Sequence, residues 1–213
     1  SPLANPGEPL GCFARGNLLQ PDFAFDAELP GRWIFAGSGT LAGSLSEKSP
    51  LNWMRGPAVL AEACESLRPQ LVRHGRRLVL VPHARHVLSD ARSALVWWSE
   101  QVIPGQELRA DTRAPQGDRP FGLALDLAAL LEPEMVADVA DHVQSWLRAM
   151  APRADALVVR GVRPGADGEG MEPCTLAEGV LPVDLVRRLA AELAPDVPVL
   201  VPGRDVGHAQ AMR

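Results

Sequence analysis

The sequence predicts a parallel α/β fold in which short buried strands alternate with amphipathic helices. Its strand-like segments are continuous apolar runs, as in sheets that are covered on both faces. Each later run is followed by a segment with apolar residues at helical spacing, which is typical of strand–helix repeats. With 213 residues, of which 46% are hydrophobic and 22% charged, the chain is long enough to bury a sizeable core. We expect one domain over 1–213, with an irregular, proline-rich lead-in over about 1–30.

The expected elements follow one another in a regular order after this lead-in. Prolines begin three of the expected helices, as is common in a first helical turn. A polar stretch over 104–120 predicts the longest loop. The expected strands are 11–15, 33–36, 78–81, 121–127, 156–159 and 197–201, and the expected helices are 57–75, 88–102, 133–150 and 182–193.

Composition excludes several classes of partner. A net charge of −5 argues against a nucleic-acid surface, because phosphate binding needs clustered basic residues. No apolar run is long enough to cross a bilayer, and no signal-peptide pattern is found, so we expect no membrane partner. Three widely spaced cysteines without a CxxC pair favour a reducing, cytoplasmic compartment. The absence of tyrosine rules out a tyrosine general acid, and a Schiff-base lysine would have to be Lys48.

Three segments carry a resemblance to a known family. The first is the strand over 78–83, which ends in Pro82 and His83; the second is the strand over 123–127, with its single acid, Asp126. The third, over 176–201, contains an Ala-Glu-Gly loop, a helix and a closing apolar strand. In order and spacing they resemble the second half of the xylose-isomerase-like TIM barrels, the sugar phosphate isomerase/epimerase family. The resemblance implies a parallel (β/α) TIM-barrel-like fold, shortened or incomplete, because about six strands are found where a full barrel has eight.

The same resemblance implies a chemistry. Family members bind a divalent metal such as Mn, Zn or Mg at the carboxyl ends of the strands, where it polarises a sugar carbonyl while a carboxylate moves a proton. Carried over to this chain, His83 and Asp126 become the metal ligands and catalytic residues, and a sugar or polyol derivative becomes the small-molecule ligand. Further family ligands fall near positions 81–82, 158–160 and 201–202, which hold no carboxylate or histidine. A non-catalytic barrel relative that has lost the metal site therefore stays open as the alternative, and enzyme activity is left undecided.

Other polar residues predict ligand contacts. Arg160 follows a strand and is suited to clamp a phosphate or carboxylate. Ser38 and Thr40 lie in the glycine-rich segment 37–43, which predicts either a loop that covers a ligand or a phosphate cradle. The phosphate cradle belongs to a third hypothesis, a doubly wound nucleotide-binding sheet, which requires a helix within a few residues of Gly39.

Two further patterns bear on metal binding and assembly. His83 and His86 form an HxxH pair, which is a weaker metal hypothesis because the segment is a turn rather than a helix. Trp97 lies beside the apolar stripe of its helix, which carries Trp98. That position predicts either packing between helices or partial exposure at a contact in a homo-oligomer.

Overall fold

The computed structural model describes residues 10–14, 16–24, 31–109, 112–115 and 117–201. The chain forms two compact units. The first comprises 1–107 and 115–123, and the second comprises 108–114 and 124–213, so that the boundary falls inside one strand, β4. The expectation of a single domain over 1–213 stays a prediction.

In the first unit, parallel strands are joined by helical crossovers. The strands are β1 (Gly11–Phe13), β2 (Trp33–Gly37), β3 (Arg77–Val81) and the first half of β4 (Phe121–Asp126). Each strand pairs in parallel with the next, for example Ile34 with Leu78 and Leu80 with Leu123. The helices are α1 (Leu51–Met54), α2 (Gly56–Arg73) and α3 (Ala91–Gln101).

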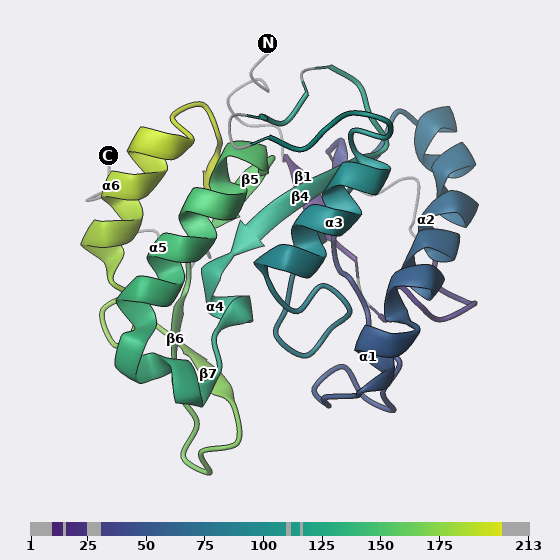
Figure 1. Cartoon of the computed structure of the whole chain (residues 1–213). Coiled ribbons are helices and arrows are strands. Elements are labelled where there is room, and N and C mark those ends of the chain that lie inside the picture. The colour runs from purple at the N-terminus through teal and green to yellow at the C-terminus, as the bar shows by residue number, and fades with distance from the viewer. Residues whose placement is uncertain (1–9, 15, 25–30, 110–111, 116, 202–213) are drawn as a thin grey trace. The chain divides into compact units, whose positions relative to one another are not determined.

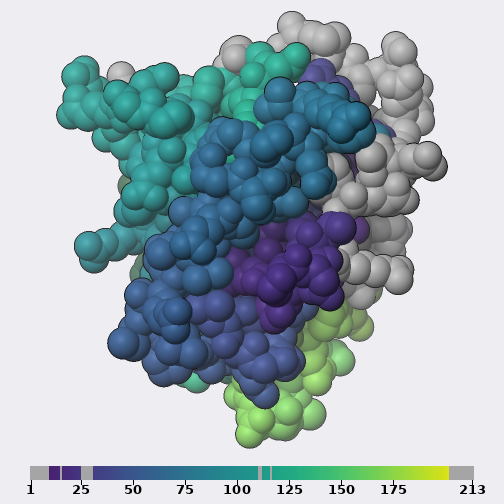
Figure 2. Space-filling model, turned by 90° about the vertical axis from the view of Figure 1, so that its right-hand side faces the viewer, coloured from purple at the N-terminus to yellow at the C-terminus, as the bar shows by residue number. Residues whose placement is uncertain are grey.

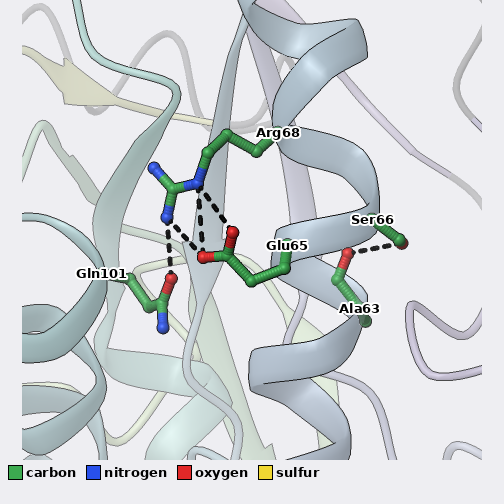
Figure 3. Close-up of polar contacts among 5 residues, drawn as sticks. All are labelled: Ala63, Glu65, Ser66, Arg68 and Gln101. Carbon is green, nitrogen blue, oxygen red and sulfur yellow. Dashed lines mark hydrogen bonds and ion pairs between the residues drawn. The ribbon is translucent and has the colours of Figure 1, made fainter.

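The boundaries of α2 and α3 have local causes in the sequence. A proline in the first turn of α2 fits the helix without losing a hydrogen bond, and Gly75, with φ of 58°, turns the chain just after the helix. Asp90 caps α3 by accepting from the Ser93 backbone N–H at 2.7 Å, and the Ser93 hydroxyl bonds back to the Asp90 backbone. The two helices are tied by Arg68 on α2, which bonds to Glu65 and to Gln101 on α3 (Figure 3).

The second unit continues the parallel order. The second half of β4 pairs with β5 (Ala156–Val158), which pairs with β8 (Val199–Leu200). Helices α5 (Val139–Met150) and α6 (Val183–Leu193) lie side by side (Figure 1). Between β5 and α6 the chain forms an antiparallel hairpin of β6 (Gly161–Pro164) and β7 (Met171–Cys174). The remaining short helices are α4 (Leu127–Leu130), η1 (Pro133–Asp138) and η2 (Ala151–Arg153).

The strand order distinguishes between two parallel α/β architectures. The six parallel strands follow the order β1-β2-β3-β4-β5-β8, so each new strand is added beside the previous one. A doubly wound sheet instead reverses direction at a switch point in its strand order. The hypothesis of a doubly wound nucleotide-binding sheet is therefore wrong on strand order. The fold is a shortened (β/α) barrel, with six strands among the described residues where a full barrel has eight.

Most expected elements are confirmed, with boundary shifts. The strand at 11–15 is real but spans Gly11–Phe13, and the helix expected over 133–150 opens with the 3₁₀ turn η1. The lead-in can be compared only in part, because 1–9 and 25–30 lie outside the described residues. Partial exposure of Trp97 is wrong, because its side chain is 5% exposed and packs edge-on against Phe121 at 6.3 Å. Within the described ranges, no helix has the length and apolar character that a bilayer span requires.

Candidate functional site

An ion pair at the carboxyl ends of two neighbouring strands is the main polar feature of the second unit. Asp126 ends β4, and Arg160 comes two residues after the end of β5. Because Asp126 lies opposite Val158 in the register, the two side chains arise from adjacent points on the sheet. The Arg160 Nε donates to Asp126 Oδ2 at 2.8 Å. Parallel α/β folds place ligands at this end of the strands, which makes the pair the candidate site.

The other oxygen of Asp126 has a structural role. Its Oδ1 accepts from the Ala129 backbone N–H at 3.2 Å, which makes Asp126 the N-cap of α4. Asp126 is only 6% exposed, so both of its hydrogen bonds form away from bulk water. The carboxylate is thereby held in one orientation, and it holds the guanidinium in turn.

Arg160 extends from this buried anchor toward the solvent. Its side chain is 25% exposed, compared with 8% for that of Asp126. Within the part of the chain that the structure describes, its Nη1 and Nη2 have no protein partner. A guanidinium held through Nε keeps its two outer nitrogens for an anion, which they contact in a bidentate manner.

The hairpin that follows fixes the backbone on the other side of Arg160. A Cβ at Gly161 would lie 2.1 Å from the Thr175 carbonyl oxygen, so only glycine fits there. The Val180 backbone N–H donates to the Val162 carbonyl at 2.9 Å, which joins the next loop to the hairpin. Glu178 of the Ala-Glu-Gly loop accepts from the Thr175 hydroxyl at 2.8 Å, and the bonds from Thr175 lower the pKa of this carboxyl. This loop therefore has a structural role beside the candidate site.

In the first unit, His83 and His86 lie in the turn after β3. Their rings stack with centroids 4.5 Å apart and an interplanar angle of 24°. Stacked rings direct their nitrogen lone pairs along parallel planes, so the two side chains do not converge on one metal ion. His83 Nδ1 also accepts from the Arg85 backbone N–H at 3.1 Å. The geometry therefore gives no support to joint chelation by the HxxH pair.

His86 is buried against the end of β2. A Cβ at Gly37 would lie 2.7 Å from His86 Cε1, so the missing side chain at Gly37 makes room for the imidazole. Burial lowers the pKa of His86, and a hydrogen bond with the Leu45 backbone opposes this shift. Its Nδ1 has no hydrogen-bond partner among the described residues. His86 is thus held as a neutral packing residue.

Both predicted hydroxyl ligands are buried and hydrogen-bonded within the protein. Ser38 is fully buried, and its Oγ accepts from the Leu88 backbone N–H at 2.9 Å. Thr40 is 1% exposed, and its Oγ1 accepts from Asn52 Nδ2 at 2.9 Å. A ligand role for Ser38 and Thr40 stays a prediction, and it would require these internal bonds to be exchanged.

Three consecutive backbone donors of the glycine-rich segment, at Thr40, Leu41 and Ala42, are also occupied. The Thr40 N–H donates to Asn17 Oδ1 at 3.1 Å, and the Leu41 N–H donates to Asn52 Oδ1 at 2.7 Å. A phosphate cradle needs such N–H groups to point at the ligand. The first helix after Gly39 begins only at Leu51, so the condition set for a nucleotide site is not met.

The two predicted metal ligands belong to different units, His83 to the first and Asp126 to the second. Across the described residues, no three side chains of His, Cys, Asp or Glu are grouped as a metal site. Asp126 also already neutralises a guanidinium cation. The described residues therefore do not fit a divalent metal, and metal binding by His83 and Asp126 stays a prediction without geometric support.

Sequence reasoning missed Asn17 and Asn52, which hold the loop after β2. Asn52 is 2% exposed and bonds to Thr40, Leu41 and the Arg85 carbonyl. Asn17 Nδ2 donates to the Thr40 carbonyl at 2.7 Å. Neither residue stands in a recognisable motif. Apolar positions on both sides of Asn52 obscure the fact that the amide, rather than its neighbours, is buried.

Comparison with known proteins identifies the fold. No family model matches the sequence, and no curated protein matches it. Among solved structures, a xylose isomerase domain protein from Planctomyces limnophilus matches with a TM-score of 0.54 and 12% identity, over 85% of this chain and 56% of that one. A D-psicose 3-epimerase, solved in the presence of D-fructose, matches with a TM-score of 0.50 and 13% identity, over 80% of this chain and 49% of that one.

The chain thus spans about half the length of these structures. At such low identity the similarity concerns the course of the backbone and does not extend to the site. It agrees with the observed order of parallel strands and helical crossovers. The chain has the fold of the xylose isomerase-like TIM barrels, in a divergent and shortened form.

Proposed function

We propose that the second unit binds a small anionic sugar derivative, such as a sugar phosphate, through Arg160 at the carboxyl end of β5. The observation that carries the proposal is the ion pair with Asp126, which anchors Nε and leaves Nη1 and Nη2 unpaired within the described part of the chain. The two solved structures named above are a xylose isomerase domain protein and a psicose epimerase, which favours sugars as the ligand class.

The two residues have different roles in this proposal. Arg160 contacts the anion through two parallel N–H bonds, which are stronger and more directional than those of neutral donors. Asp126 is a positioning residue, because it touches Arg160 and leaves the ligand to the guanidinium. Its negative charge also offsets part of the positive charge of Arg160. Anion binding therefore depends on the geometry of the two outer guanidinium nitrogens, Nη1 and Nη2, as well as on charge.

Binding, without isomerisation, is the function that this geometry supports best. A carboxylate that acts as a general base must reach the substrate proton, whereas each Asp126 oxygen already accepts a hydrogen bond from the protein. The metal-dependent isomerase remains the second candidate, and it is favoured by the similarity in fold.

Calorimetric titration with a panel of pentose and hexose phosphates and their neutral parent sugars tests the proposal. At least one phosphate should bind more tightly than its parent sugar. Arg160→Gln should weaken that binding at least tenfold, because it removes the charged fork, and Arg160→Lys should retain part of it. The matched control is Arg187→Gln, which removes an exposed guanidinium of the same unit that pairs with Asp184.

The control variant should bind like the wild type, and circular dichroism should show that each variant folds. Equal binding of phosphates and parent sugars, or phosphate binding that Arg160→Gln leaves intact, would contradict the proposal.

A further inference from the structure

Buried apolar residues occupy the carboxyl ends of β4 and β5 around the ion pair of Asp126 and Arg160. On the hairpin side, Val159 and Val162 are each 2% exposed. On the β4 side, the five residues after Asp126 are all apolar and 1–4% exposed: Leu127, Ala128, Ala129, Leu130 and Leu131. Figure 1 shows α4 and the hairpin at the same end of these strands. The ion pair is therefore flanked by packed apolar chain on both sides.

The loop after the hairpin packs against the same end of the strands. Leu176 and Leu181 are 4% and 5% exposed. A Cβ at Gly179 would lie 3.0 Å from the Val162 backbone nitrogen, so the loop lies directly on the start of the hairpin. A side chain that lined a pocket of sugar size would keep surface accessible to water. The burial of these residues therefore leaves no room for a sugar ring among them.

The polar groups beside Arg160 are engaged with the protein itself. Both Asp126 oxygens accept hydrogen bonds, and the Thr175 hydroxyl donates to Glu178 at 2.8 Å. A sugar hydroxyl is recognised by a polar group that has a donor or acceptor to spare. The guanidinium has such donors, because its Nη1 and Nη2 are unpaired within the described ranges and its side chain is 25% exposed.

We propose, as an inference that rests on the function above, that the site recognises the phosphoryl group of its ligand and leaves the sugar in the solvent. The ligand class is then phosphate monoesters, irrespective of the group that carries the phosphate. Two phosphate oxygens accept from Nη1 and Nη2 of Arg160, and the ester oxygen faces away from the protein. Beyond its buried base the hairpin, light green in Figure 2, is exposed at Arg163, Pro164 and Glu172, so the ester group has water beside it.

Affinity should therefore depend little on the sugar. A site that bonds a particular hydroxyl rejects an analogue without it by a large factor, because the protein group is then left unpaired. A hydroxyl that stays in water contributes no such discrimination. Glycerol, ribose and glucose, each phosphorylated on its terminal carbon, should accordingly have dissociation constants that agree within about threefold.

Nuclear magnetic resonance titration of the full chain at pH 7.5, where each phosphate is mainly a dianion, tests the proposal. The amide signal of Gly161, next to Arg160, reports the binding even of weak ligands. It should shift with all three phosphates and stay in place with the parent glycerol, ribose and glucose. Arg160→Gln should weaken the binding of the three phosphates by the same factor, at least tenfold, because the lost contact is common to them. The matched control, Arg187→Gln, should bind all three like the wild type.

The comparison among ligands is made on the wild type, so it does not depend on the folding of a variant. A ribose or glucose phosphate that binds at least tenfold more tightly than the glycerol phosphate overturns phosphoryl-only recognition and leaves the function proposed above in place. If Glu178→Gln abolishes that preference, the exposed carboxylate of the loop is the sugar contact. Binding of none of the phosphates overturns both proposals.

Discussion

Among single residues, neutral side chains hold the loops that follow β2 and β3 in place. Asn52 both donates and accepts, and it satisfies backbone groups of two loops from one buried position. Ser38 joins the same two loops by accepting from the Leu88 N–H. Buried amides and hydroxyls of this kind stabilise a fold only while each bond is made, because every unpaired group keeps its desolvation cost.

Asn52→Ala should therefore destabilise the protein by about 2–4 kcal/mol, since it leaves the Leu41 N–H and the Arg85 carbonyl without their partner. The free energy of unfolding from urea denaturation measures the effect. Ser44→Ala is the control, because Ser44 bonds to Ser46 at the surface. Its effect should stay within about 0.5 kcal/mol. An Asn52→Ala effect as small as that of the control would contradict the role assigned to this amide.

His86 should make stability depend on pH. Burial lowers its pKa in the folded protein, whereas the unfolded chain has an ordinary histidine pKa of about 6.5. Below pH 6.5 the unfolded state therefore binds more protons, and stability falls as the pH decreases from 6.5 toward the folded-state pKa, by up to about 1.4 kcal/mol per pH unit.

Urea denaturation of the wild type and of His86→Gln between pH 7 and pH 5 isolates this contribution. The variant should lose part of the pH dependence. The exposed His74, replaced in His74→Gln, provides the control and should leave the dependence as in the wild type. Identical pH profiles for wild type and His86→Gln would show that His86 is not the group responsible.

Among the elements, glycines mark the points where two segments approach each other too closely for a side chain. Gly37 at the end of β2 makes room for an imidazole, and Gly161 at the start of β6 lies against the Thr175 backbone. The two contacts differ in how readily they yield. A side chain can rotate away, whereas the backbone of a paired strand cannot move without breaking the hairpin.

Gly161→Ala should therefore destabilise the β6–β7 hairpin severely, by about 3 kcal/mol or more, and disturb the adjacent Arg160. Gly43→Ala is the control, because its nearest neighbour would be a flexible Glu47 oxygen at 3.5 Å. Urea denaturation measures the stability, and hydrogen exchange of the Cys174 amide, which lies opposite Gly161 in the ladder, reports the hairpin directly. Unchanged protection in Gly161→Ala would contradict the close packing.

The sequence predicted those elements whose signal is local. Strands β2 to β5 and helices α2 and α6 appear as apolar runs or stripes that do not depend on the rest of the chain. The hairpin was missed, because β7 exposes a glutamate and a proline and has no alternating pattern. For Trp97 the packing alternative is confirmed and partial exposure is wrong, because α3 buries two adjacent tryptophans rather than a single apolar stripe.

In the candidate site, too, the sequence predicted what a local pattern specifies and missed what depends on distant segments. Asp126 and Arg160 were both placed at strand ends, because an apolar run that stops at a charged residue is visible in the sequence. Their pairing depends on the register of β4 and β5, which sets Asp126 opposite Val158, and no local pattern specifies a register. The hydrogen bonds of Ser38 and Thr40 depend on distant loops in the same way.

At the scale of the molecule, the described residues form six parallel strands in barrel order, and the ends of these strands hold few metal ligands. The strands β2, β3 and β5 end at Gly37, Val81 and Val158. Conserving the order of a barrel requires only the apolar pattern of its strands, whereas a metal site requires particular donors at several strand ends at once. The same fold can therefore occur with a metal site or without one.

Elemental analysis of the purified chain, which includes Asp205 and His208 beyond the described residues, should accordingly find less than one divalent metal ion per chain. Incubation with excess manganese or zinc should not raise the melting temperature, because a ligand that binds only the folded state would stabilise it measurably. Asp126→Ala should leave the metal content unchanged, whereas it should weaken sugar-phosphate binding by freeing the guanidinium of Arg160. A stoichiometric metal that is lost in Asp126→Ala would restore the metal-dependent isomerase as the better account, since only a ligand role makes the metal depend on that carboxylate.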